Sequence, residues 1–327
     1  MKNFFKNLIL FSVIPLLLLI VIDFYLRNIN TVYSAKYEGL MKIKDSVEVI
    51  FLGNSHANYG IDPSAFRNFK TYNLANVSQL IYFDRRLLEK VLNEKVSNLK
   101  YVFISIDYHS FYSSDQGMRN VWTYYAYGIK YKNQSYTKAI LSPFLWGYTP
   151  KVSISLIKKD IIRQIKYGEI SNNFDVEEGV NIQDSLWNGF LGFTGQDESL
   201  FNEEKFKARV KEFEEKRVAS ERQEIIEDLI SFIKYLKKNE IEPILFSAPT
   251  YSEYNQYLDR VTINQNKDIT NKICEEFNIQ YWDYMEDGRF NKSDFFNPDH
   301  LNKNGAKKLS LMLNDRLSEF DLERKKK

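Results

Sequence analysis

The sequence predicts an α/β domain built on a parallel central sheet, preceded by one N-terminal helix that crosses a membrane. Short β-branched, apolar runs recur along the chain, and segments whose apolar residues have helical spacing separate them. Strands that alternate with helices in this way are typical of a doubly wound sheet. The chain has 327 residues, of which 44% are hydrophobic, so it can bury a core of this kind.

The N-terminal segment is apolar almost without interruption over residues 8–26. This length approaches the roughly 20 residues that span a bilayer, and the two lysines before it favour a cytoplasmic amino terminus. The alternative is a cleaved signal peptide, but Tyr-Ser-Ala at residues 33–35 is a poor cleavage site. We therefore expect a membrane anchor over residues 1–28, a juxtamembrane linker over 29–45 and an extracytoplasmic domain over 46–327.

The expected strands of this domain follow from apolar, β-branched runs at residues 47–52, 72–75, 101–106, 243–249 and 279–284. Apolar residues at helical spacing predict helices over residues 79–96, 151–167, 268–277 and 301–320, and one or two helices over 201–239. Residues 107–200 break this alternation and are crowded with Tyr, Trp and Phe over their first part, so we expect an irregular, aromatic-rich insertion there.

The charge and the cysteine content exclude some classes of protein. The formal net charge is +2, but five lysines lie at the two chain ends, so the body of the chain carries −3. No basic domain for nucleic acid is therefore predicted. A single cysteine, Cys274, cannot form an intramolecular disulfide, and no zinc-type Cys/His spacing exists.

The stretch FLGNSHANYG places Ser55 on a small polar turn directly after the first predicted strand. A serine on such a turn is a common nucleophile, although serine is also a favoured helix N-cap. The chain has three histidines: His56, His109 and His300. His300 precedes the last predicted helix, where a loop side chain of an α/β sheet reaches the ligand-binding edge. No two of the histidines share a metal-ligand spacing, so no metal site is expected.

Gly-Asn-Ser-His after the first strand, together with Asp-His-Leu-Asn before the last helix, resembles the SGNH (GDSL-type) hydrolase superfamily. The resemblance covers residues 47–317 apart from the aromatic middle. The anchor and the layout are most similar to its envelope branch, which includes the D-alanyl-lipoteichoic acid biosynthesis protein and alginate-type polysaccharide O-acetyltransferases. The resemblance implies a three-layer fold, with Ser55 as the nucleophile and His300 as its base.

The resemblance also implies an oxyanion hole made by the Ser55 N–H and a donor from the turn at residues 73–78. The family usually has a glycine in that turn, and here Asn76 or Ser78 takes its place. The asparagine that the family often carries after the next strand is absent, and Tyr108 or His109 would substitute for it.

Adjacency places Gly53, Asn54 and His56 in the same site, although His56 and His109 also fit structural roles. The family's triad aspartate lies three residues before the histidine, where this chain has Asn297. Asp294 and Asp299 are the alternative acids.

The implied function is transfer of an acyl group, expected to be acetyl, to or from a cell-surface polysaccharide through an acyl-serine. Such chemistry needs no cofactor. Family members of this layout often work beside a multipass membrane acyltransferase, so the resemblance implies such a partner by analogy. The alternative is a non-catalytic scaffold of the same fold that binds a glycan or a membrane partner, which the altered acid position favours. The aromatic stretch at residues 121–136 either packs over the sheet edge or forms a sugar platform that includes Trp122 and Tyr125.

Overall fold

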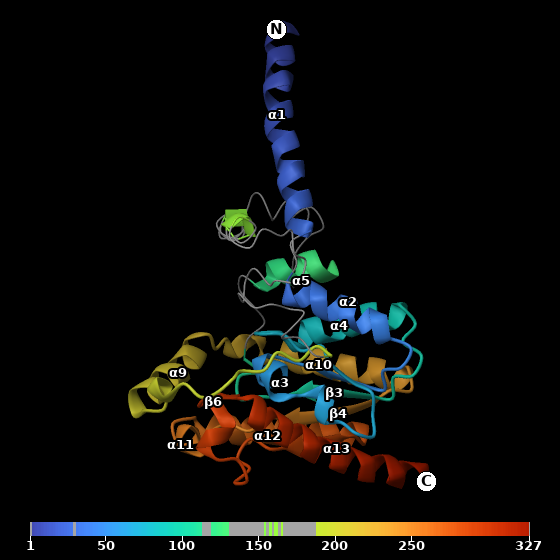
Figure 1. Cartoon of the computed structure of the whole chain (residues 1–327), viewed down its shortest axis with the longest axis vertical. Coiled ribbons are helices and arrows are strands. Elements are labelled where there is room, and N and C mark those ends of the chain that lie inside the picture. The colour runs from blue at the N-terminus through green and yellow to red at the C-terminus, as the bar shows by residue number, and fades with distance from the viewer. Residues whose placement is uncertain are drawn as a thin grey trace. The chain divides into compact units, whose positions relative to one another are not determined.

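The computed structural model describes residues 2–28, 31–112, 119–130, 154, 157, 158, 160–162, 165 and 188–326. Figure 1 traces the whole chain and labels its helices and strands. The chain divides into two compact units. One unit comprises Met1–Ala35 and Gly117–Gln183, and the other comprises Lys36–Gln116 and Asp184–Lys327. Most of the helix expected over residues 151–167 lies outside the described residues. So do residues 131–136 and the side chains of Trp122 and Tyr125, so the sugar platform stays a prediction.

The first unit contains helix α1 (Lys2–Arg27), the start of α2 (Val32–Ile43) and helix α5 (Asn120–Tyr127). The Tyr25 hydroxyl donates to the Asp160 carboxylate, and the Tyr33 and Tyr127 rings lie 6.0 Å apart. Within the part of the chain that the structure describes, no helix combines the length and the apolar character needed to cross a membrane.

The second unit is an α/β domain on a five-stranded sheet of order β2-β1-β3-β4-β5. The strands are β1 (Val49–Leu52), β2 (Thr71–Asn73), β3 (Tyr101–Ser105), β4 (Glu242–Ser247) and β5 (Gln280–Asp283). Every neighbouring pair is parallel. The predicted parallel α/β sheet is therefore confirmed, and all five expected strands are present.

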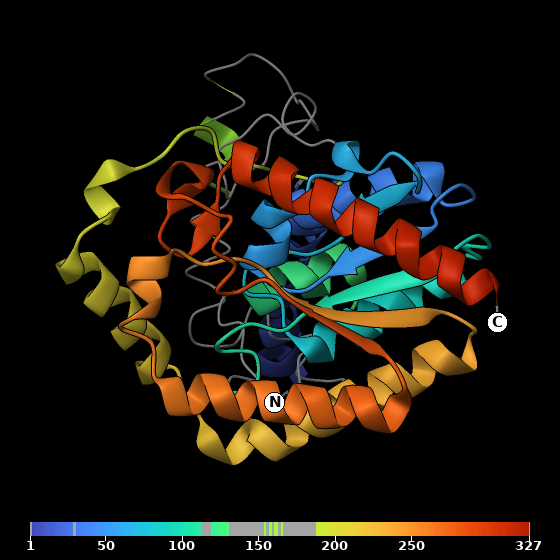
Figure 2. The ribbon, with the colours of Figure 1, turned by 90° about the horizontal axis from the view of Figure 1, so that it is seen from below.

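Helices cover both faces of this sheet: α13 lies on one face, and α10 and α12 lie on the other (Figure 2). The longer helices are α4 (Ile81–Asn93), α9 (Glu203–Glu215), α10 (Arg222–Lys238), α12 (Arg260–Phe277) and α13 (Lys303–Lys325). The segment at residues 201–239 thus forms two helices. Helix α12 begins earlier than expected, because the Asp259 side chain caps the N–H groups of Val261 and Thr262.

Short elements complete the domain. They are α3 (Ser55–Gly60), α11 (Ser252–Asn255) and the 3₁₀ turns η1 (Pro63–Ala65), η3 (Glu198–Leu200), η4 (Ala219–Glu221) and η5 (Lys292–Asp294). An antiparallel hairpin of β6 (Phe295–Asn297) and β7 (His300–Leu301) lies just before α13.

Stacked aromatic rings fill the core beside the central strands. Phe51 of β1 stacks on Phe103 of β3, with ring centroids 4.4 Å apart, and Phe246 of β4 meets both rings. These side chains are fully buried. Burial of such large apolar side chains stabilises the central strands, whose carboxyl ends carry the polar groups described below.

The turn after β1 depends on Gly53, whose φ of 127° lies in a region that side chains rarely adopt. A Cβ at this position would lie 2.4 Å from the Cβ of Ser105, at the end of β3. The Gly53 N–H donates to the Asp84 carboxylate of α4, and the Gly53 carbonyl accepts from the Asn76 N–H, both at 3.1 Å. Only glycine lets β1 end this close to β3.

We expect Gly53→Ala to lower the free energy of unfolding by more than about 2 kcal/mol, because of both the positive φ and the clash with Ser105. Urea denaturation followed by circular dichroism measures this. Gly288→Ala is the matched control, since a Cβ there meets open space. Equal stability losses in the two variants would contradict close packing as the cause.

Candidate active site

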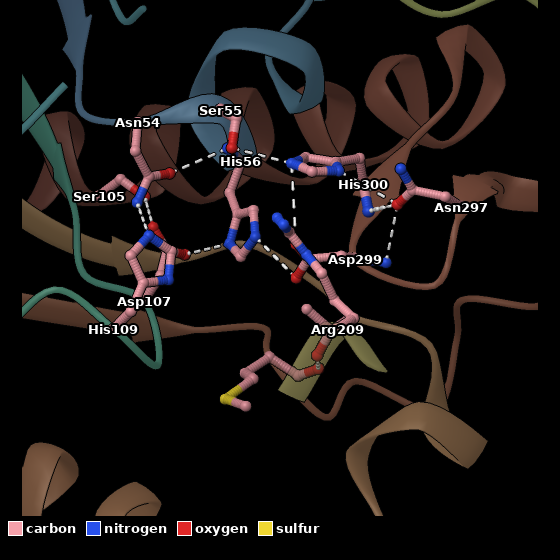
Figure 3. Close-up of polar contacts among 12 residues, drawn as sticks. Asn54, Ser55, His56, Ser105, Asp107, His109, Arg209, Asn297, Asp299 and His300 are labelled. Atoms are coloured by element: carbon pink, nitrogen blue, oxygen red, sulfur yellow. Dashed lines mark hydrogen bonds and ion pairs between the residues drawn. The ribbon is translucent and has the colours of Figure 1, made fainter. Parts of the chain in front are cut away.

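Ser55 and His300 meet at the carboxyl edge of the sheet, although 245 residues separate them along the chain. Ser55 is the first residue of α3, which the Asn54 side chain caps by accepting the His56 N–H at 2.9 Å. His300 begins β7. Its Nε2 lies 2.8 Å from Ser55 Oγ, and both residues are buried, at 8% and 9% exposure (Figure 3).

Asn297 orients the His300 ring from the opposite strand of the hairpin, where the two residues are paired. Its Oδ1 accepts the backbone N–H groups of Asp299 and His300 at 3.0 and 2.8 Å, which identifies this atom as the oxygen. The same oxygen lies 3.1 Å from His300 Nδ1, so Nδ1 carries the hydrogen. Nε2 is then the bare nitrogen, and the Ser55 hydroxyl donates to it.

Burial keeps this imidazole neutral. Loss of solvent lowers the pKa of His300 to about 3, and the nearby positive charges of His56 and Arg209 act in the same direction. The Asp299 carboxylate opposes them without reversing the shift. His300 is therefore a free proton acceptor at neutral pH.

Asp294 is not directed at the imidazole. Its carboxylate pairs with Lys308 at 2.9 Å and accepts the Asn291 N–H at 2.9 Å, where it caps η5. Of the three residues considered as triad acid, Asn297 therefore contacts His300 Nδ1, Asp294 belongs to a cap, and Asp299 lies on the Nε2 side, with its Oδ2 3.9 Å from that atom.

An ion network lies beside the Ser55–His300 pair, and all of its members except Arg209 are buried. His56 Nδ1 lies 2.8 Å from Asp107 Oδ1, and His56 Nε2 lies 3.0 Å from Asp299 Oδ1. Arg209 of α9 donates through Nε and Nη2 to Asp299 Oδ2 at 3.0 and 2.7 Å. Ser105 donates to the remaining oxygen of Asp107 at 2.7 Å. The network joins α3, the end of β3, the β6–β7 loop and α9.

His56 is positively charged in this setting. Burial alone would lower its pKa, but the carboxylates of Asp107 and Asp299 outweigh that effect and raise the pKa of His56 to about 10. Both carboxyl groups are also buried, which opposes ionisation, yet the His56 charge holds the pKa of Asp107 and of Asp299 below their usual range. The paired charges thus keep one another ionised.

The other two aromatic candidates pack against α9. His109 stacks on Phe213 with ring centroids 4.7 Å apart, and its Nε2 lies 3.1 Å from Asn54 Nδ2. Burial and the charge of His56 lower the pKa of His109 to about 4, so this ring is neutral. The Tyr108 hydroxyl donates to Glu214 at 2.7 Å. Both residues therefore border the site.

The turn expected to supply a second oxyanion donor is held by its own hydrogen bonds. The Asn76 backbone N–H donates to the Gly53 carbonyl. Its side-chain amide donates to Leu74 O and, at 2.8 Å, to Gln79 Oε1. Ser78 is half-buried in the same turn, with a φ of 58°. Ser55 starts α3, and the first N–H groups of a helix have no acceptor within it, so the Ser55 N–H is the better-placed donor.

The sequence analysis did not identify three residues of this region as site residues. Asp107 lies two residues after the end of β3, so its position just beyond a buried strand could have identified it. Asp84 interrupts the apolar face of α4, and burial raises its pKa to about 7. Arg209 lies on a helix that is mostly exposed and charged, which offers no signal in the sequence.

The fold also brings together a group that sequence spacing does not indicate as metal ligands. Ligand atoms of His56, Asp299 and His300 all lie within 4.8 Å of one another. A histidine must be neutral to bind a metal, whereas His56 is held charged by two carboxylates. His300 Nε2 already faces the Ser55 hydroxyl. The donors therefore fit the ion network better than a metal.

No protein-family model and no curated protein matches the sequence. Among solved structures, a Bacteroides fragilis protein assigned as an acylhydrolase is similar over 84% of this chain and 87% of its own, at 12% identity and a TM-score of 0.39. A GDSL-like lipase from Bacteroides thetaiotaomicron is similar over 85% of this chain and 90% of its own, at 12% identity and a TM-score of 0.37. An acetylxylan esterase from Geobacillus stearothermophilus is similar over 82% of this chain and 93% of its own, at 12% identity and a TM-score of 0.32. At these scores no residue role is carried over from them.

The charge on His56 makes stability depend on pH. Because its folded pKa is raised, His56 contributes stability that is complete below about pH 6.5 and is lost as the pH rises towards 10. We expect the wild type to lose roughly 2–3 kcal/mol more than His56→Gln between pH 7.5 and 9.5. Urea denaturation at both pH values measures the difference, and groups common to both proteins cancel.

His109→Gln is the control for this comparison, because His109 is neutral across the whole interval and the variant should keep the wild-type loss. His56→Gln should also be less stable at pH 7.5, since Asp107 and Asp299 then lose their shared cation. A wild-type protein whose stability falls no more than that of His56→Gln would show that His56 is not a buried cation.

Proposed function

We propose that this chain is a serine-dependent acyl-transfer enzyme of the SGNH type, in which Ser55 is the nucleophile. The observation that carries the proposal is the Ser55 Oγ–His300 Nε2 contact of 2.8 Å, with Nδ1 of the same ring held by Asn297. A hydroxyl that donates to a bare, oriented imidazole nitrogen is the arrangement that activates serine.

In the proposed reaction, Ser55 Oγ attacks the acyl carbonyl carbon while its proton moves to His300 Nε2. The Ser55 N–H stabilises the negative charge that develops on the carbonyl oxygen. As the ester bond breaks, the departing alcohol takes the proton from His300 and an acyl-serine remains. Water or a sugar hydroxyl then attacks this ester, gives its proton to His300, and releases the acid or the acylated sugar as the proton returns to Ser55.

The finer assignment is an acyl group, which we take to be acetyl, on a cell-surface polysaccharide. It rests on the resemblance of the GNSH and DHLN motifs to envelope enzymes of the SGNH type, and on the apolar N-terminal segment, which we propose tethers the domain outside the cytoplasm. A multipass membrane acyltransferase is the proposed donor partner. The competing possibility is a scaffold that binds a glycan without chemistry, and the reactivity of Ser55 separates the two.

We expect the full-length chain to form a covalent adduct on Ser55 when it is treated with a small fluorophosphonate. Intact-protein and peptide mass spectrometry locate the adduct. Ser55→Ala should give none, and Ser252→Ala, which removes an exposed serine at the start of α11, should label as the wild type does. A folded wild-type chain that forms no adduct would contradict the enzyme proposal and favour the non-catalytic scaffold.

The rate of this labelling should depend only weakly on pH between 5 and 7. The neutral form of His300 is the active one, and a pKa of about 3 leaves it neutral at pH 5. A histidine of ordinary pKa would instead lose about 25-fold in neutral form over the same interval. Labelling rates measured at pH 5, 6 and 7 decide between these outcomes.

A further inference from the structure

The reaction proposed above puts a proton, and with it a positive charge, on His300 Nε2. In a serine triad, one aspartate both orients the histidine and stabilises this charge. Here Asn297 contacts Nδ1 at 3.1 Å and orients the ring, but an amide has no charge to offer. A second group must therefore supply the negative charge, or the imidazolium forms without help.

Asp299 is placed to supply it. Its Oδ2 lies 3.9 Å from His300 Nε2, the atom that also faces Ser55 Oγ at 2.8 Å. The side chain of Asp299 is almost completely buried, at 3% exposure, so water screens its charge little. The other charged groups that act on His300 are His56 and Arg209, and both oppose a positive charge on the ring; His109 is neutral at neutral pH and opposes it only when protonated.

The partners of Asp299 keep its carboxyl group ionised and leave Oδ2 close to His300. Arg209 binds Oδ2 through two nitrogens, and His56 binds Oδ1. His56 is in turn held charged by Asp107. Asp299 therefore stays a carboxylate beside His300 whatever the protonation of His300 itself.

We propose that the two tasks of a triad acid are divided in this chain, with Asn297 orienting His300 and Asp299 supplying the compensating negative charge on the Nε2 side. The division rests on the proposed function for its role in catalysis, but the electrostatic coupling itself does not. Arg209 is then a positioning residue that fixes Asp299 and at the same time weakens its field at His300.

A purely structural role for Asp299 predicts something different. If the Arg209–Asp299 pair only fastens α9 to the β6–β7 loop, removing either partner should loosen the same contact and change the site in the same direction. If Asp299 supplies charge, the two partners act on His300 with opposite signs. Loss of the anion makes the His300 imidazolium less stable, and loss of the cation makes it more stable.

The test is the pKa of His300, followed by NMR of the imidazole resonances in the full-length Asn297→Asp background. The new carboxylate beside Nδ1 should move this pKa up into a range where the protein is folded. The chain has three histidines, so His56→Gln and His109→Gln assign the signals. Adding Asp299→Asn should lower the pKa of His300 by about one pH unit, and adding Arg209→Gln should raise it by a similar amount.

Lys207→Gln is the matched control for Arg209→Gln, because it removes an exposed cation from the same helix and should leave the pKa of His300 unchanged. Shifts of the same sign for Asp299→Asn and Arg209→Gln, or none, would overturn the proposal. Should Asp299→Asn unfold, Arg209→Gln/Asp299→Asn removes both charges of the pair together. Under the proposal their opposite effects cancel and the pKa of His300 stays close to that of the Asn297→Asp background, whereas a site that is merely loosened and wetter would raise it.

Labelling of Ser55 gives an independent readout. Asp299→Asn should slow the reaction with fluorophosphonate by about 10²-fold, and Asn297→Asp/Asp299→Asn should regain at least about tenfold, because one carboxylate again faces the ring. No regain would contradict the division of tasks. A wild-type chain that never labels would sink the enzyme proposal instead, while the NMR shifts would still test the coupling.

Discussion

The buried ion network around His56 is the interaction on which the rest of the site depends. Charged side chains are costly to bury unless opposite charges and hydrogen bonds surround them. His56, Asp107, Asp299 and Arg209 pair their charges with one another, and they come from α3, the end of β3, the β6–β7 loop and α9. None of these segments can move far without leaving a buried charge unpaired, so the network fixes the loops that carry Ser55 and His300.

The parallel sheet explains why such a network can form at all. Parallel strands end at one edge, and ligand sites of open α/β sheets lie there. β1 and β3 are neighbours with Phe51 opposite Phe103, so the turn at Gly53 and the end of β3 at Ser105 meet. The absence of a side chain at Gly53 permits this approach and brings His56 within reach of Asp107. Core packing and site chemistry therefore depend on the same close contact between two strands.

Much of this could be predicted from the sequence, and the exceptions have physical reasons. The central strands β1, β3 and β4 are fully buried, mainly apolar runs, which is the pattern that predicts parallel strands, and the two edge strands were expected as well. The roles of Asn297 and Asp299 could not be distinguished from the sequence. Their spacing from His300 along the chain does not reveal that Asn297 faces Nδ1 and Asp299 faces Nε2. Arg209 belongs to a helix whose contacts arise only from tertiary packing.

The asparagine at position 297 is consistent with the charge balance of the four groups in the ion network around His56. His56 and Arg209 contribute two positive charges, and Asp107 and Asp299 contribute two negative charges. With a neutral His300 these four groups sum to zero. An aspartate at 297, a half-buried position, would add a third carboxylate beside these groups, and its negative charge would be balanced by a partner in the site only if His300 were protonated. Asparagine orients the ring without that charge, and so keeps His300 in the neutral form that accepts a proton.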